Sequence, residues 1–121
     1  MSHNPIFICD DEQEILRYLK KLFEMKGMQV ETFCSGETLL GRLQDPACPS
    51  PRLLIQDIHL GEENGIDIAR EVRKIEPGLP VIMITGYNSA EAESRAFEAG
   101  ARAFLPKPFP KERLLEVVEG M

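Results

Sequence analysis

Apolar residues are distributed along this chain in two alternating patterns, short continuous runs and longer stretches with helical spacing. Continuous runs of Ile, Val, Leu and Phe are typical of strands that are buried on both faces of a sheet. They predict strands at residues 5–9, 28–33, 52–56, 80–84 and 102–105. In the stretches between and after them, apolar residues return every three or four positions, which predicts an amphipathic helix after each strand.

The ends of these helices also show in the sequence. The first helix is predicted over residues 12–26 and stops at Gly27, and the second begins after the N-cap residue Ser35. The third carries apolar residues up to Ile75, and the last two cover residues 89–99 and 110–119. Two loops contain no regular element in this interpretation, the proline-rich residues 45–51 and the residues 58–63.

Five strands that alternate with five helices predict an α/β fold with a parallel sheet. Right-handed crossovers place helices on both faces of such a sheet, which gives a doubly wound three-layer sandwich. The run at 28–33 is the least apolar and is expected at an edge, whereas 80–84 is the most apolar and is expected at the centre. The pattern alone does not determine the order of the strands.

Composition limits the class of protein. With 121 residues, of which 43% are hydrophobic and 28% charged, the chain is expected to form a single folded domain over residues 1–121. It has no apolar run of about 18–20 residues, so no membrane helix is predicted. The first residues lack the basic and apolar regions of a signal peptide, and a cytoplasmic location is expected.

Net charge and cysteine content exclude further classes. A net charge of −6 argues against direct nucleic acid binding by this domain, because a phosphate backbone is bound by a basic face. Cys9, Cys34 and Cys48 are odd in number and lack the spacing of a metal site. We interpret them as reduced thiols that serve as small apolar residues.

Four of the predicted strands lead into side chains that can handle phosphate or a metal ion. These side chains are Asp10, Asp11, Asp57, Thr85 and Lys107. The carboxyl ends of parallel strands lie at one edge of the sheet, where α/β folds place their ligands. Three carboxylates, a hydroxyl and an ammonium at one edge therefore predict a site for a divalent cation and a phosphoryl group.

Each acidic residue also has a simpler interpretation. Asp10 and Asp11 precede a helix, where carboxylates often cap free N–H groups, and Asp57 alone could be a solvated loop acid. Capping needs one aspartate, however, and three neighbouring carboxylates repel one another unless a cation compensates. Mg²⁺ is the expected ion, and Asp57 beside it is a candidate nucleophile that forms an aspartyl phosphate.

The hydroxyl and the ammonium have simple interpretations too. Thr85 could be a strand-end residue before the turn at Gly86, and Lys107 could be a solvated lysine held in a turn by Pro106 and Pro108. In the functional interpretation, Thr85 donates a hydrogen bond to a phosphoryl oxygen, and Lys107 neutralises phosphoryl charge.

In these features the chain resembles the receiver domain of bacterial two-component response regulators over residues 5–119. The resemblance rests on the pair Asp10-Asp11, on Asp57 with Gly65 downstream, on Thr85-Gly86, on the turn Ala99-Gly100-Ala101 and on the segment 104–109. It implies a flavodoxin-like sheet with strand order 2-1-3-4-5 and five helices.

The resemblance also implies a role for each site residue. Asp57 accepts a phosphoryl group from the phosphohistidine of a sensor histidine kinase or a phosphotransfer protein. Mg²⁺ is held by the carboxylates of Asp10, Asp11 and Asp57 and by the backbone carbonyl of His59. The protein is then a phosphorylation-activated switch in a phosphorelay and no enzyme, apart from its own phosphoryl transfer and dephosphorylation.

In this family the switch runs from the phosphate to a distant face. Lys107 and Thr85 contact the phosphoryl oxygens, and the movement of Thr85 leaves space for Phe104 to turn inward. This changes the face made by the fourth helix, the fifth strand and the last helix, which controls an output domain or partner and is a possible homodimer surface. The resemblance further implies a cis peptide bond between Lys107 and Pro108.

Four positions depart from the common family pattern. Gly61 stands where proline is frequent, and Gln56 is polar where the residue before the acceptor is usually apolar. His59 and Tyr87 occupy positions that influence in the family how fast the phosphate is lost. None of these departures removes a group that the chemistry requires, so an active receiver is expected.

Three alternative functions come from other classes of protein. A pseudo-receiver that is never phosphorylated is the main alternative, and the presence of Asp57, Thr85 and Lys107 argues against it. An aspartate-nucleophile phosphatase usually has its nucleophile on the first strand in an Asp-x-Asp pattern, and a flavodoxin does not place acids beside its flavin phosphate. The sequence leaves open the kinase, the output, the phosphate lifetime, the oligomeric state, and whether the chain stands alone or belongs to a larger regulator or hybrid kinase.

Overall fold

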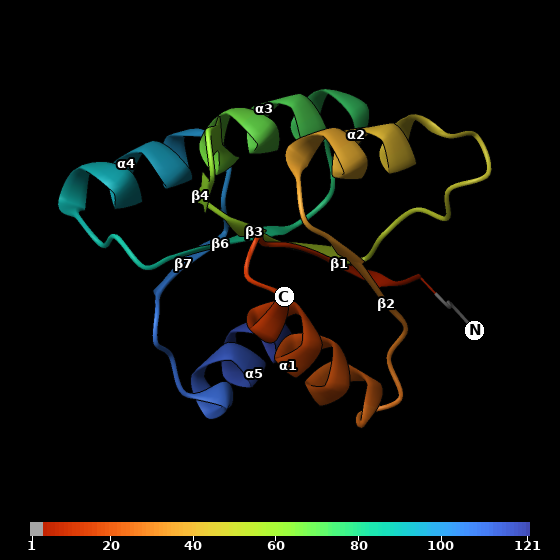
Figure 1. Cartoon of the computed structure of the whole chain (residues 1–121), viewed down its shortest axis with the longest axis horizontal. Helices are drawn as coiled ribbons and strands as arrows, with labels where there is room; N and C mark the ends of the chain where they lie inside the picture. Colours follow the sequence, from red (N-terminus) through yellow and green to blue (C-terminus); the bar gives the residue numbers. More distant parts are fainter. Residues whose placement is uncertain (1–3) are drawn as a thin grey trace.

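A computed structural model describes residues 4–121, so the part of the signal-peptide prediction that rests on residues 1–3 lies outside the described residues. Its main elements alternate between strand and helix, as the sequence predicts (Figure 1). In chain order they are β1 (Ile6–Cys9), α1 (Gln13–Glu24), β2 (Val30–Phe33), α2 (Gly36–Gln44), β3 (Leu53–Asp57), β4 (His59–Leu60), β5 (Glu63–Asn64), α3 (Gly65–Ile75), β6 (Val81–Thr85), α4 (Ala90–Glu98), β7 (Ala103–Pro106) and α5 (Lys111–Glu119).

The five long strands form one parallel sheet in the order β2-β1-β3-β6-β7. Counted without the short hairpin, this is the order 2-1-3-4-5 that the family resemblance implies. The prediction that residues 28–33 form an edge strand is confirmed, because β2 is outermost and only half-buried. The prediction of a central place for residues 80–84 was wrong by one strand. β3 is central, and since β3 and β6 are both buried along their whole length, hydrophobicity does not distinguish them.

Helices cover the sheet on both sides, which makes three layers (Figure 1). Side chains that alternate along each strand feed two separate cores, because successive residues of a strand point to opposite faces. Phe7, Leu54 and Met83 belong to the core beneath α2, α3 and α4. Ile8 and Ile55 belong to the core that also contains buried residues of α1 and α5. The uninterrupted apolar runs of the sequence therefore reflect strands that are buried on both faces.

Local signals set several of the helix ends. The hydroxyl oxygen of Ser35 accepts a hydrogen bond from the backbone N–H of Thr38 at 3.2 Å, so Ser35 is the N-cap that the sequence predicts. Gly27 after α1 and Gly100 after α4 have positive φ angles of 81° and 100°, a conformation that glycine adopts without steric cost. No helix among residues 4–121 is both long and apolar enough to cross a membrane.

One element is absent from the sequence prediction. The predicted loop at residues 58–63 contains most of an antiparallel hairpin, in which His59 of β4 pairs with Asn64 of β5 and Leu60 pairs with Glu63. Two-residue strands are too short to produce a recognisable periodicity, so the sequence pattern could not reveal them. The hairpin follows β3 directly and therefore lies at the edge of the sheet where the candidate site is located.

Candidate functional site

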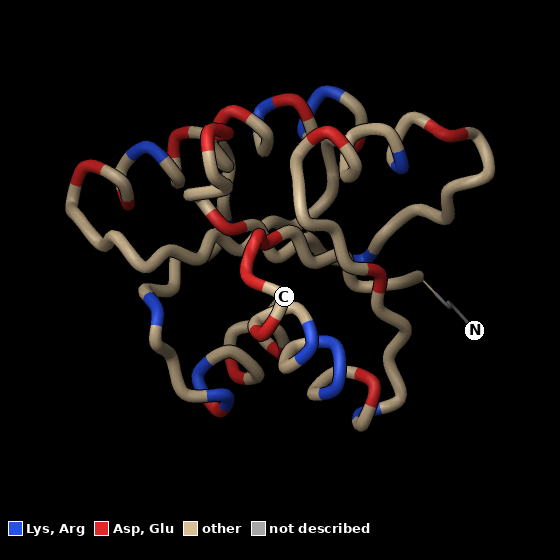
Figure 2. Tube along the Cα trace, in the orientation of Figure 1, with Lys and Arg blue, Asp and Glu red and all other residues tan. Residues whose placement is uncertain are grey.

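Three aspartates meet at the carboxyl edge of the central strands. Asp57 is the last residue of β3, and Asp10 and Asp11 follow β1, so the parallel pairing of β1 with β3 brings them together. One carboxylate oxygen from each lies within 4.8 Å of the others. Figure 2 shows acidic positions where β1 leads into α1. The sequence predicted this convergence, and it is the strongest concentration of like charge in the site.

Burial makes this cluster costly in the absence of a cation. Asp10 has no exposed surface and Asp57 is 2% exposed, whereas Asp11 faces solvent. Burial and the neighbouring Asp10 carboxylate raise the pKa of Asp57, and with Lys107 acting in the opposite direction the net result is a pKa of about 7. A carboxyl group with this pKa is poised between its neutral and charged forms near neutral pH, and a nearby cation favours the charged form.

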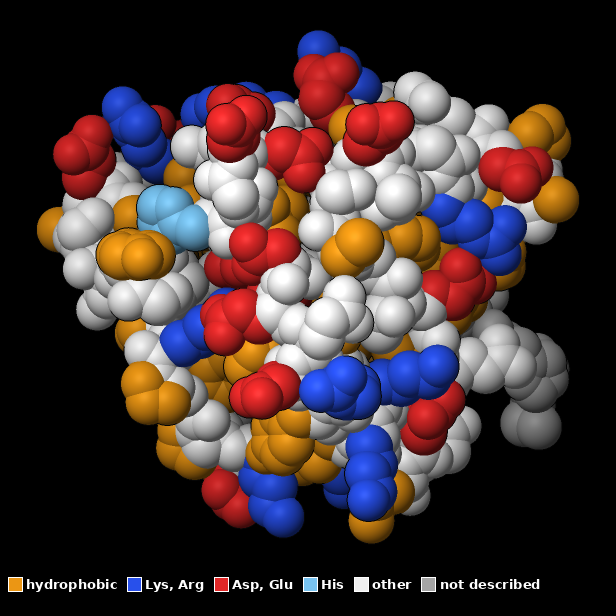
Figure 3. Space-filling model, in the orientation of Figure 1, with side chains coloured by type: hydrophobic (Ala, Val, Ile, Leu, Met, Phe, Trp, Pro, Cys, Tyr) orange, Lys and Arg blue, Asp and Glu red, His pale blue; other side chains and the backbone are white. Residues whose placement is uncertain are grey.

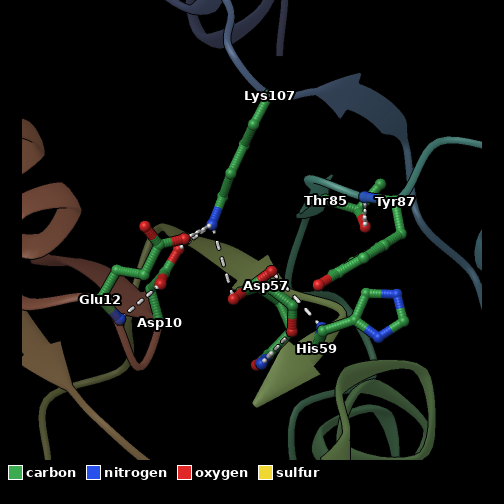
Figure 4. A network of polar contacts seen from close by, with 8 residues as sticks. Asp10, Glu12, Asp57, His59, Thr85, Tyr87 and Lys107 are labelled. Atoms are coloured by element: carbon green, nitrogen blue, oxygen red, sulfur yellow. Dashed lines mark hydrogen bonds and ion pairs between the residues drawn. The ribbon is translucent and has the colours of Figure 1, made fainter. Parts of the chain in front are cut away.

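Lys107 provides one positive charge for the cluster. Its Nζ lies 2.9 Å from an oxygen of Asp10, 2.9 Å from an oxygen of Glu12 and 3.6 Å from an oxygen of Asp57 (Figure 4). Burial lowers the pKa of Lys107, but the carboxylates of Glu12 and Asp10 outweigh this effect and raise it above its usual value. The lysine is therefore charged, and it stands closer to Asp10 than to the candidate acceptor Asp57.

The simple capping interpretation accounts for part of the acidic pair. One oxygen of Asp10 accepts a hydrogen bond from the backbone N–H of Glu12 at 2.8 Å, so Asp10 does satisfy a free donor at the start of α1. The N-cap residue Glu12 has no side-chain capping bond. Capping does not explain why the carboxylates of Asp11 and Asp57 lie beside that of Asp10. Carboxylate oxygens are the hard donors that bind Mg²⁺ in proteins, and the cluster borders an open pocket where waters can complete the coordination, so the residues present fit this ion.

Thr85 lies at the end of the adjacent strand β6. Among the described residues, no hydrogen bond joins its hydroxyl to Asp57. Thr85 is fully buried, and its hydroxyl oxygen accepts a hydrogen bond from the backbone N–H of Tyr87 at 3.0 Å. The backbone N–H of Lys107 donates to the Thr85 carbonyl at 2.7 Å, so β6 and β7 fix these two residues relative to each other. The predicted cis peptide bond between Lys107 and Pro108 is present.

Phe104 is buried in this structure. Its side chain is 9% exposed and belongs to the core beneath α4, together with Met83 and Ala96. The predicted switch turns the Phe104 ring from an outward to an inward position. In this structure the ring is already inward, so the movement itself is not seen. The role of Phe104 as a switch residue therefore stays a prediction.

Two aromatic rings border the site on its solvent side. The rings of His59 and Tyr87 make an edge-to-face contact with centroids 4.6 Å apart, and Tyr87 is 72% exposed (Figure 4). The backbone N–H of His59 points to an Asp57 oxygen at 3.4 Å. On the face turned to the viewer in Figure 3, acidic side chains gather near a histidine and a basic side chain. An open pocket of about 550 Å³ lies here, lined by Asp11, Glu12, Asp57, His59, Gly61, Gly86, Tyr87 and Lys107.

The sequence analysis assigned no role in the site to two polar residues, Glu12 and Gln56. Glu12 contacts Lys107, and its place directly after the acidic pair was the available signal. Gln56 appeared only as a departure from the family pattern, and the structure shows that its side-chain N–H donates to the backbone carbonyl of Asp57 at 3.0 Å. Gly65 matters for a steric reason, since a Cβ atom there collides with the same carbonyl. Such contacts depend on backbone geometry that no sequence pattern specifies.

Comparisons with known proteins agree with this geometry. The family model described as the response regulator receiver domain matches residues 6–119. The response regulator protein TodT of Pseudomonas putida is 33% identical over 113 residues, which cover 93% of this chain and 48% of TodT. The transcriptional regulatory protein CpxR of Klebsiella pneumoniae is 37% identical over 112 residues, which cover 93% of this chain and 46% of CpxR.

Solved structures give the same result. The crystal structure of a CheY-like receiver domain protein from Methanospirillum hungatei superimposes with a TM-score of 0.91 at 31% identity, covering 98% of this chain and 93% of that one. The receiver domain of NtrX from Brucella abortus gives a TM-score of 0.85 at 32% identity, covering 95% of each chain. The chain spans about half the length of the curated relatives TodT and CpxR.

Proposed function

The chain belongs to the response regulator receiver domain family, and on this basis we propose that it is a phosphorylation-activated switch whose acceptor is Asp57. The observation that carries the proposal is the convergence of carboxylate oxygens of Asp10, Asp11 and Asp57 within 4.8 Å, with the ammonium of Lys107 in ion pairs with Asp10 and Asp57. This arrangement suits the transfer of a phosphoryl group to a carboxylate, because it supplies acceptor, cation site and charge neutralisation together.

The proposed reaction moves one phosphoryl group. A carboxylate oxygen of Asp57 forms a bond to phosphorus while the bond from phosphorus to the donor breaks, and the donor leaves with that electron pair. Asp10, Asp11, Asp57 and the backbone carbonyl of His59 would hold Mg²⁺, and the bound ion would supply charge stabilisation at the phosphoryl oxygens. The donor is the phosphohistidine of a sensor histidine kinase or phosphotransfer protein, and the chain catalyses only this transfer and its own dephosphorylation.

In this mechanism the ammonium of Lys107 moves from Asp10 toward the phosphoryl group on Asp57. In the unphosphorylated protein its ammonium is 2.9 Å from Asp10 and 3.6 Å from Asp57. A phosphoryl group on Asp57 brings further negative charge and three acceptor oxygens, which attract the ammonium toward that side. Thr85 gives up its contact with the Tyr87 N–H or shares it, and its hydroxyl donates to a phosphoryl oxygen.

The output face of the switch is the one made by α4, β7 and α5. α4 buries only one of its own residues, Ala96, within the described structure, so it has little packing to lose when Thr85 moves toward the phosphate. A changed face can bind an output domain, a partner or a second copy of the chain. The receiver interpretation also implies a cytoplasmic location and no direct nucleic acid binding by this domain.

A pseudo-receiver is the second candidate function, and chemistry separates the two. We expect incubation with acetyl phosphate and Mg²⁺ to give an adduct that neutral hydroxylamine removes, because an aspartyl phosphate is an acyl phosphate. An adduct that resists hydroxylamine contradicts the proposed chemistry. The absence of any adduct, when Mg²⁺ binding is confirmed separately, favours the pseudo-receiver.

A further inference from the structure

The side chain of Glu63 connects the short hairpin to a different layer of the fold. Its Oε1 accepts a hydrogen bond of 2.9 Å from the backbone N–H of Gly36, the first residue of α2. The two residues are 27 positions apart in the chain. This N–H belongs to the free donors at the start of a helix, where a carboxylate is favoured by both hydrogen bonding and the helix dipole.

The start of α2 is shaped to receive this carboxylate. Ser35 already accepts from the N–H of Thr38, so Glu63 serves a donor that the N-cap residue leaves free. Gly36 is buried, and a Cβ atom at this position meets the side chain of Ile68 and lies 3.0 Å from the second oxygen of Glu63. The glycine therefore leaves room for the carboxylate and for the packing of α2 against α3, which lie side by side in Figure 1.

The same hairpin carries the predicted fourth Mg²⁺ ligand. β5 pairs with β4, so Glu63 is opposite Leu60, and His59 is opposite Asn64. The hairpin is fixed at its base by the backbone N–H of Gly65, which donates to the carbonyl of Ile58 at 2.6 Å. Glu63, on the second strand of the hairpin, adds a contact to the start of α2. Because the hairpin is held both at its base and at α2, the His59 carbonyl within it has less freedom to move.

We propose that Glu63 is a positioning residue that fixes the 58–64 segment against α2 and thereby presents the His59 carbonyl to Mg²⁺. This inference rests on the proposed function, since it concerns the same metal site. Glu63 itself lies outside the predicted ligand set and acts through the backbone of the hairpin. Glu62 is the natural control, because it is exposed, has the same charge and makes no hydrogen bond or ion pair among the described residues.

The first experiment needs no metal. Amide exchange of metal-free protein measures the protection of the Gly36 N–H in wild type and in the variants Glu63→Ala, Glu63→Gln and Glu62→Ala. We expect faster exchange of Gly36 in Glu63→Ala, relative to core amides of β1 and β3, and near wild-type exchange in the other two variants. Unchanged exchange in Glu63→Ala overturns the proposed contact.

The second experiment measures Mg²⁺ affinity by titration calorimetry on the same four proteins. We expect the Kd of Glu63→Ala to rise about tenfold, at the low end of the roughly 10–100-fold effect of residues that orient metal ligands, because Glu63 acts through the backbone of the hairpin. Glu63→Gln loses the charge but keeps an oxygen acceptor, so we expect a Kd within about twofold of wild type, as for Glu62→Ala.

The outcomes separate this inference from the proposed function. Equal weakening in Glu63→Ala, Glu63→Gln and Glu62→Ala shows an effect of charge alone and overturns the positioning role, as does wild-type affinity in Glu63→Ala. A loss of thermal stability in Glu63→Ala with unchanged Mg²⁺ affinity assigns Glu63 to α2 capping only. If wild-type protein binds no Mg²⁺ and forms no adduct, the proposed function itself is wrong.

Discussion

Asp57 combines two properties that oppose each other, deep burial and a need for negative charge. Burial and the Asp10 carboxylate raise its pKa to about 7, so in the metal-free protein the neutral form is favoured below that pH. A nucleophile must be deprotonated, and added positive charge favours this form inside the protein. We therefore expect the site to depend on a cation, because Asp57 lies at the end of a buried strand beside a second buried carboxylate.

This pKa predicts how the stability of the metal-free protein changes with pH. Between about pH 4 and pH 7 the folded state keeps a proton on Asp57 that the unfolded state has lost, so the folded state binds more protons in this range. The free energy of unfolding should fall as the pH rises through it. Urea denaturation of metal-free protein at several pH values measures this effect. Mg²⁺ at roughly a hundred times its Kd should raise the free energy of unfolding by about 2–3 kcal/mol and so offset the loss.

The variant Asp57→Asn serves as the control for this prediction. It keeps the shape of the side chain and removes its titration, so its free energy of unfolding should change less between pH 4 and pH 7 than that of wild type. An identical pH dependence in the two proteins contradicts the assignment of the effect to Asp57.

A second residue-scale prediction concerns Gly65. A Cβ atom at this position collides with the backbone carbonyl of Asp57, which cannot move without displacing the acceptor. We expect Gly65→Ala to lower the free energy of unfolding by about 2–4 kcal/mol in urea denaturation. Gly41→Ala is the matched control, because Gly41 lies in α2 with open space around it and should gain about 0.5–1 kcal/mol. Equal effects of the two substitutions contradict the steric argument.

At the scale of elements, the helices differ in how many of their residues are buried against the sheet and its neighbours. α3 buries Gly65, Ile66, Ile68, Ala69 and Val72, whereas α4 buries Ala96 alone among its own residues. Hydrophobic contacts supply most of the stability of a helix in a folded protein. Among the helices of the described residues, α4 buries the fewest of its own residues, so we expect the lowest cost of local movement there, which suits the face that is proposed to change on phosphorylation.

This difference predicts the exchange of backbone amides. In the unphosphorylated protein we expect amides of α4 to exchange at least about tenfold faster than those of α3, since local opening exposes less apolar surface. Phosphorylation should then change the exchange of α4 and β7 while leaving α3 largely unaffected. Equal protection of α3 and α4, or no change in α4 on phosphorylation, contradicts the proposed output face.

The predictability of the elements followed their length. Five long strands and five helices were predicted with boundaries within a few residues, because their apolar runs and spacing persist over several positions. The hairpin of β4 and β5 was not predicted, since two residues per strand carry no period. Hydrophobicity placed β6 at the centre, but the order of strands in a sheet depends on crossovers that hydrophobicity does not describe.

At the scale of the whole molecule, the sheet explains why the site could be predicted at all. Parallel strands bring their carboxyl ends to one edge, so residues as distant as Asp10 and Lys107 could be assigned to one site from the sequence. The contacts of Glu12, Gln56 and Glu63 could not be, because they depend on side-chain reach and loop geometry. The rigid sheet supplies the predictable part of the site, and the loops supply the rest.

The most direct test of the account is the intact mass of the protein after incubation with acetyl phosphate. We predict the mass increase of one phosphoryl group in wild type with Mg²⁺, and no increase with a chelator in its place or in the variant Asp57→Asn. This result follows if Asp57 is the acceptor and the aspartate cluster binds the cation. A phosphoryl adduct of equal extent in Asp57→Asn, or one that forms equally without Mg²⁺, contradicts the central claim.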